Sequence, residues 1–203
     1  RASCSPARIR MDSFMPACTR RDFLLRAAAG LAAFATTSVV RAEGIVLAQA
    51  DITLKGEQFQ LSGHFDIDLS PTLEKALTRG VQLTFVQAFE AQRERDYWLA
   101  EDLIDLQRSV RLSYNALLRQ YYVTLQGVYS SHESLEDALR AVGDLRDWVV
   151  LNVKQTKKKS TNLAYIRMYL DIAQLPKPLQ VNALASSARW QLDSGWQERT
   201  FKY

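Results

Sequence analysis

The chain has 203 residues, of which 47% are hydrophobic and 24% charged, and its formal net charge is +4. This composition is that of an ordinary globular protein and excludes a disordered or membrane-embedded chain. Of its 26 basic and 22 acidic residues, seven basic and three acidic ones lie in the first 50 positions, so residues 51–203 carry 19 of each. A phosphate-binding surface needs an excess of Lys and Arg, and we therefore expect no nucleic-acid partner.

Residues 1–50 have the organisation of an export leader. Arg20 and Arg21, followed by Phe23 and Leu24, resemble a twin-arginine export signal. The Ala-rich stretch 27–40 is shorter than the roughly 20 residues of a transmembrane helix and is typical of a signal-peptide apolar region. A general secretory signal is the alternative. Since Met11 or Met15 is a better start than Arg1, residues 1–10 are interpreted as upstream translation.

Two small-residue sites could be cut by a signal peptidase, one ending at Ala42 and one ending at Ala50. The second is preferred, because Ala48 and Ala50 occupy both key positions and Asp51 begins the first strand-like pattern. Cleavage there would leave a single β-rich domain, residues 51–203, without a transmembrane span. We expect this domain to be periplasmic or secreted. An uncleaved signal would instead tether the domain to the inner membrane. Both cysteines, Cys4 and Cys18, belong to the leader.

The remaining chain alternates apolar and polar residues with the period of strands, interrupted by two helix signatures. Ser70 and Ser134 are expected as N-caps, and Gly80 and Gly143 as the ends of these helices. Residues 92–105 are interpreted as a polar, acidic connection. The expected strands, in chain order, cover residues 51–57, 59–67, 81–90, a central hairpin at 106–125, 148–153 and 164–172, with one or two closing strands in the tail 190–201.

This pattern predicts a mainly β fold, an antiparallel β-sandwich of about seven or eight strands with two short helices. The alternative is an α+β fold in which one curved antiparallel sheet carries both helices on one face.

The sequence contains no residue set that catalysis would require. Ser62, His64 and Asp66 have the identities of a hydrolase triad, but Ser62 is too short to reach across the roughly 6.6 Å between alternate residues of a strand. The acids Asp96, Glu101, Asp102 and Asp105 lack the spacing of a calcium loop, and His64 and His132 are the only histidines. We therefore predict no catalytic site, no metal site and no cofactor. Binding residues stay unknown, with the four tryptophans and the Lys157–Lys159 patch as candidates.

Four ordered motifs carry a resemblance to a known family: LSPTLEKAL (69–77), RLSYNALLRQY (111–121), SLEDALRAVG (134–143) with RDW (146–148), and QLPKPLQVNAL (174–184). Together they resemble the uncharacterised, exported domain-of-unknown-function family 4390, found mainly in betaproteobacteria. The resemblance covers residues 51–203 and implies export but no activity. It also implies that the gene often lies beside that of a nitrogen-regulation-type membrane sensor kinase.

These observations favour an exported, non-catalytic binding or interaction module, with a protein partner in the envelope, the sensor kinase being the candidate. The alternative is an envelope hydrolase whose site is assembled from separated loops. The two differ in that a hydrolase needs a nucleophile and titratable groups that converge in a cleft.

Overall fold

The computed structural model describes residues 44–93, 101–156, 160–180 and 190–203. The chain divides into two compact units, residues 1–40 and 41–203, and every described residue belongs to the second. The predicted export residues Arg20, Arg21, Phe23 and Leu24 lie outside the described residues, as do Asp96, Trp98 and Lys157–Lys159.

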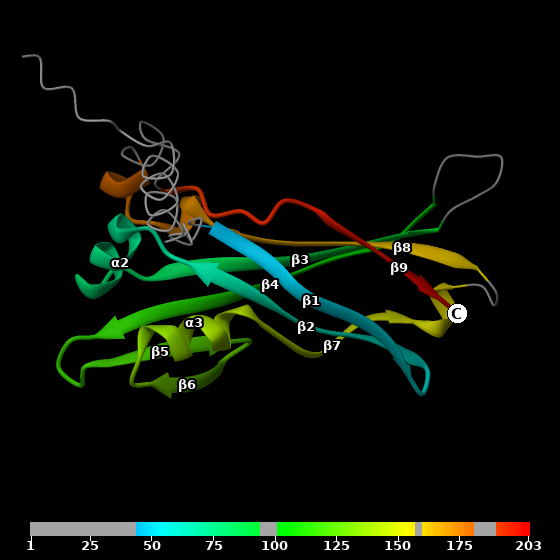
Figure 1. Cartoon of the computed structure of the whole chain (residues 1–203), viewed down its shortest axis with the longest axis horizontal. Coiled ribbons are helices and arrows are strands. Elements are labelled where there is room, and N and C mark those ends of the chain that lie inside the picture. The colour runs from blue at the N-terminus through cyan, green and yellow to red at the C-terminus, as the bar shows by residue number, and fades with distance from the viewer. Residues whose placement is uncertain (1–43, 94–100, 157–159, 181–189) are drawn as a thin grey trace, which may run out of the picture. The chain divides into compact units, whose positions relative to one another are not determined.

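Two antiparallel sheets form the second unit (Figure 1). The smaller sheet has the order β1-β2-β7, and the larger has the order β6-β5-β4-β3-β8-β9. The strands are β1 (Gly44–Lys55), β2 (Gln58–Asp68), β3 (Leu83–Arg93), β4 (Glu101–Asn115), β5 (Gln120–Leu125), β6 (Val128–His132), β7 (Asp144–Asn152), β8 (Thr161–Leu170) and β9 (Gln197–Lys202). The predicted β-rich, sandwich-like fold is confirmed, with nine described strands rather than seven or eight.

Both predicted helices are present and begin at the predicted caps. In α2 (Pro71–Thr78) the Ser70 hydroxyl accepts a hydrogen bond from the Leu73 amide, and in α3 (Leu135–Gly143) the Ser134 hydroxyl accepts one from the Asp137 amide. Each cap satisfies an amide that has no partner within its helix. Two short 3-10 helices, η1 (Val153–Gln155) and η2 (Ile172–Gln174), follow β7 and β8.

The core lies between the sheets and is closed by aromatic contacts that join them. Phe59 of β2 packs edge-on against Phe201 of β9, with ring centroids 5.2 Å apart. Phe89 of β3 packs in the same manner against Trp148 of β7 at 6.3 Å. Phe59, Phe89 and Phe201 are all buried, so these pairs hold the two sheets together through the hydrophobic effect and edge-to-face geometry.

One buried polar group connects the sheets to α3. Gln87 of β3 is fully buried and donates to the Val142 carbonyl at 2.9 Å, while its side-chain oxygen accepts from Arg108 at 2.6 Å. The Arg108 guanidinium also lies 4.3 Å from the ring centroid of Trp148. A cation at the carbonyl end of α3 interacts favourably with the helix dipole.

The structure differs from the sequence-based expectation at the start of the domain. β1 begins at Gly44 and not at Asp51, and Ala48 and Ala50 of the preferred cleavage site lie inside it. Ile45 and Leu47 are 4% and 8% exposed, so they belong to the core. A β-bulge between Leu47 and Gln49 interrupts the register and returns Ala50 and Ile52 to the inner face. This irregularity breaks the simple alternation that marks a strand.

The β3–β4 hairpin and β6 also differ from the sequence-based expectation. β3 continues to Arg93 and β4 begins at Glu101, so much of the expected acidic connection belongs to a long hairpin. β6 was not expected. Four of its five residues are exposed, which leaves no alternation of buried and wet positions to detect.

Candidate binding surface

The side of β1 that faces away from β2 is its free edge, called the β1 edge below. Among the described residues β1 pairs only with β2, along 11 register positions. β1 also comes close to β9, but no strand pairing joins the two. In an antiparallel pair, alternate residues point their amide and carbonyl groups away from the partner. The β1 edge therefore presents a row of backbone donors and acceptors without a described partner.

The β1 edge is the longest strand edge among the described residues. The other outer strands are β7 with nine residues, β9 with six and β6 with five. β7 is further distorted by two irregularities in its register with β2 and by the positive φ of 43° at Asp147. Natural proteins usually protect an edge strand from pairing with another chain by charged residues, by Pro or by keeping the strand short. β1 has no Pro, and its two charged residues are Asp51 and Lys55.

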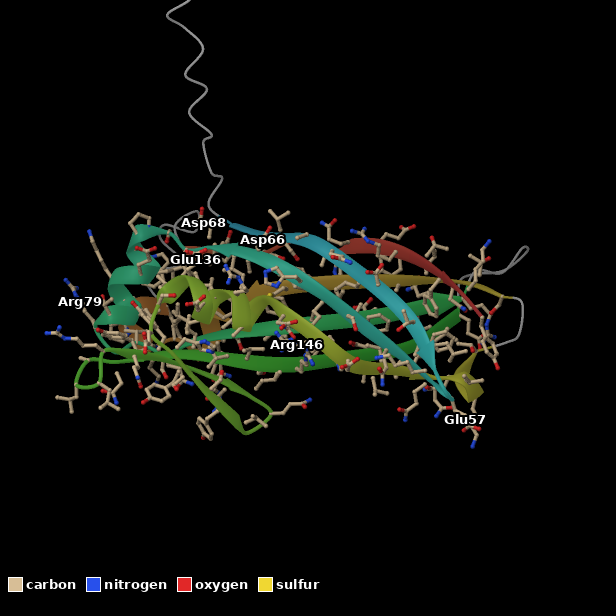
Figure 2. The ribbon with its side chains drawn as sticks, turned by 60° about the horizontal axis from the view of Figure 1, so that its bottom comes forward. Glu57, Asp66, Asp68, Arg79, Glu136 and Arg146 are labelled. Atoms are coloured by element: carbon tan, nitrogen blue, oxygen red, sulfur yellow. The ribbon has the colours of Figure 1, made fainter. Side chains whose placement is uncertain are left out.

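A groove of about 380 Å³ lies where the start of β1 and the end of β2 meet α3. We call it the acidic groove. β1 contributes Gly44 and Val46, the end of β2 contributes residues 64–68, and α3 contributes Glu136, Leu139 and Arg140. Figure 2 shows Asp66, Asp68 and Glu136 close together where β2 meets α3.

Close packing of α3 on β2 fixes the shape of this groove. A Cβ atom at Gly143 would lie 2.0 Å from the Phe65 carbonyl oxygen, so only glycine permits this approach. Glu136 and Asp137 both form ion pairs with Arg140, at 3.3 and 3.4 Å. Of the side chains that line the groove, Asp66, Asp68 and Glu136 are acidic and Arg140 is basic, so its formal charge is negative, which favours a cationic ligand group.

The structure does not arrange Ser62, His64 and Asp66 as a hydrolase triad. His64 Nε2 lies 3.4 Å from an Asp66 carboxylate oxygen. Within the described residues no hydrogen bond joins Ser62 to His64, although spacing alone does not exclude one, since Ser130 and His132 meet across the same two-residue spacing on β6. The His64–Asp66 pair is therefore a feature of the acidic groove and lacks a hydroxyl nucleophile from Ser62.

Sequence reasoning missed a second serine and histidine. Ser130 Oγ and His132 Nε2 of β6 are 3.0 Å apart and share a hydrogen bond. Both lie on the short edge strand, and His132 also lines a separate polar pocket with Asp137, Asp144 and Arg146. A serine and a histidine two residues apart on a strand can therefore form a hydrogen bond, because the imidazole is long enough to span the distance. This two-residue spacing was the signal in the sequence that could have identified the pair.

The other candidates are distributed over the sheets. Glu101 pairs with Arg93 at 2.9 Å, and Asp102 accepts a hydrogen bond from Gln92, so these acids stabilise the β3–β4 hairpin. No group of three or more His, Cys, Asp and Glu side chains in the described part of the chain is placed to hold a metal ion. Trp148 and Trp190 are buried, whereas Trp196 is 41% exposed.

The fold and this surface define a two-sheet antiparallel domain with an open sheet edge beside an acidic groove. The family model described as "Domain of unknown function (DUF4390)" matches residues 42–200, and the chain belongs to this family. No curated protein and no solved structure matches the chain significantly. Among the helices of the described residues, none has the length and apolar character needed to span a membrane.

Proposed function

We propose that this protein is an exported, non-catalytic interaction module that binds an extended segment of an envelope protein by adding it as a strand to the β1 edge. The observation that carries the proposal is the long row of backbone groups on β1 without a described partner. Strand addition uses main-chain hydrogen bonds for affinity and side-chain pockets for specificity.

The acidic groove supplies the specificity in this proposal. Val46 is 60% exposed and stands opposite Asp66 in the β1–β2 register. A strand added beside Val46 places its long side chains over the small sheet, within the field of Asp66 and Asp68. We therefore infer that the preferred segment carries Lys or Arg next to apolar residues that cover Val46.

The partner proposed is the sensory segment of a membrane sensor kinase, and the compartment proposed is the periplasm. Both follow from the export-type leader and from the family resemblance. Retention at the inner membrane by an uncleaved signal would keep the module beside the same partner.

A site-specific crosslink tests the proposal. A photoreactive amino acid at Gln49, an exposed residue midway along β1, should give an adduct with the sensor kinase in intact envelopes, identified by mass spectrometry. The matched control places the same group at Tyr129, which is 75% exposed on the edge strand of the other sheet. Equal adducts from both positions, or no envelope adduct from Gln49, would contradict strand addition at β1.

The hydrolase alternative now rests on one observation, the Ser130–His132 hydrogen bond. A serine hydrolase built on this pair should be labelled by a fluorophosphonate probe, and the label should disappear in a Ser130→Ala variant. Our proposal predicts no labelling at Ser130.

A further inference from the structure

The turn between β4 and β5 exposes two leucines. Leu117 is 95% exposed and Leu118 60% exposed, and both lie in the four-residue connection 116–119. Polar residues and Gly dominate such turns because they satisfy the local backbone. Two adjacent, exposed leucines at this position therefore have no role in the fold itself.

The turn is held in a defined conformation. The Asn115 side-chain oxygen accepts hydrogen bonds from the amides of Leu117 at 3.0 Å and Leu118 at 3.2 Å. Arg119 closes the turn with a positive φ of 54°. These contacts direct the backbone of the turn without using either leucine side chain.

Basic side chains surround this turn. Arg119 belongs to it, and Arg79 at the end of α2 lines one pocket together with Asn115 and Ala116. Figure 2 shows Arg79 at the same end of the second unit. Within the described residues, neither arginine forms an ion pair. The neighbouring helix α2 carries a further exposed basic residue, Lys75. Glu74 and Glu133 are the acids of the flanking segments, so positive charge is in excess.

Tyrosines lie behind the leucines. Tyr114 and Tyr121 form a ring pair with centroids 4.8 Å apart at the base of the turn, and Tyr122 lines the pocket with Arg79. Apolar side chains at a tip, followed by a layer of tyrosine and arginine, match the depth profile of a bilayer interface.

We propose that the β4–β5 turn docks on the surface of a bilayer that contains anionic phospholipid. Leu117 and Leu118 enter the boundary between headgroups and acyl chains, and Arg79 and Arg119 contact lipid phosphates. Docking at this end leaves the β1 edge available, so the inference does not depend on the proposed partner.

A fluorescent reporter in the turn tests this docking in the full chain. With Cys4→Ser and Cys18→Ser as background, an environment-sensitive dye is attached to Leu118→Cys. The matched control carries the dye at Val128→Cys, which replaces a side chain that is 72% exposed at the start of β6. Both proteins are titrated with vesicles of phosphatidylethanolamine and phosphatidylglycerol, and with vesicles of phosphatidylcholine alone. The charge-reversal variant described below distinguishes docking through the turn from binding through the N-terminal leader.

The proposal predicts a blue shift at position 118 with the anionic vesicles and none at position 128. Adding Arg79→Glu and Arg119→Glu should weaken the response at 118 by roughly tenfold or more, since each charge near an anionic surface contributes about a factor of five. Identical responses at 118 and 128 would overturn it. A shift at 118 without vesicles that grows with protein concentration would also overturn it, because a second copy would then cover the leucines.

Discussion

Arg108 is the residue whose environment is least expected from its sequence position in an amphipathic strand. It is 9% exposed, donates to Gln87 and to the Asp144 carbonyl, and stacks on Trp148. Burial lowers the pKa of this guanidinium to about 10, and the nearby Asp144 charge acts in the opposite direction. The side chain therefore stays charged at neutral pH, where its hydrogen bonds offset part of the desolvation cost.

Replacing this arginine tests its structural role. Arg108→Ala should lower the free energy of unfolding by about 3 kcal/mol, because it leaves the buried Gln87 oxygen unpaired and removes packing on Trp148. Urea unfolding measures the change. Arg111→Ala on the same strand is the control, because Arg111 is exposed and should change stability by less than about 0.5 kcal/mol. Equal losses from both variants would contradict a specific role for Arg108.

Asp193 gives the domain a predictable response to acid. Hydrogen bonds from Arg167 hold the pKa of Asp193 below its ordinary value, with burial acting in the opposite direction. A carboxyl group whose pKa is lower in the folded state stabilises the fold above its unfolded pKa, and this contribution is lost as the pH falls through the folded pKa.

Asp193→Asn should therefore lose stability relative to the parent at pH 7 and match it more closely as the pH falls below about 4. The difference should stay below about 1 kcal/mol, because the pair is partly exposed to solvent. Unfolding free energies measured from neutral to acidic pH decide this. A difference that grows on acidification would have the wrong sign.

At the scale of elements, local signals in the sequence predicted what local interactions determine. The helices begin directly after Ser70 and Ser134, because the serine hydroxyl caps the first turn of each. The central hairpin was predictable because apolar and polar residues alternate along strands that bury one face. β1 and β6 were misjudged for physical reasons. The bulge at Ala48 breaks the alternation in β1, and β6 is fixed by pairing with β5 rather than by burial.

The position of β1 changes the expectation for signal cleavage. Cleavage after Ala50 would remove the buried Ile45 and Leu47 and more than half of β1. Cleavage after Ala42, the other site in the sequence, leaves β1 intact. If the protein is exported as proposed, we therefore expect the mature chain to begin at Glu43, and intact-mass measurement of the protein recovered from the envelope fraction tests this. A mature chain that begins at Asp51 would contradict the requirement for these core residues.

At the scale of the whole molecule, the candidate surface depends on residues far apart in the sequence. The acidic groove joins the start of β1, the end of β2 and α3, which are brought together because α3 packs beside β2 through Gly143. No pattern in the sequence connects Asp68 with Glu136. The open edge is likewise a property of strand order, which periodicity alone does not specify.

The central claim is that the amides on the outer side of β1 bind a partner strand. Adjacent residues on a strand point their amides in opposite directions, so of Ala50→Pro and Asp51→Pro one removes an amide that bonds to β2 and the other an outward amide. Thermal unfolding distinguishes them, since loss of the bond to β2 should cost about 1 to 3 kcal/mol.

The decisive measurement uses the proline variant that is as stable as the parent. It determines how much of the proposed kinase adduct this variant still gives from Gln49. Our account predicts that this variant folds normally and no longer gives the adduct from Gln49. Undiminished adduct formation by a stably folded variant that lacks an outward amide would contradict strand addition at β1.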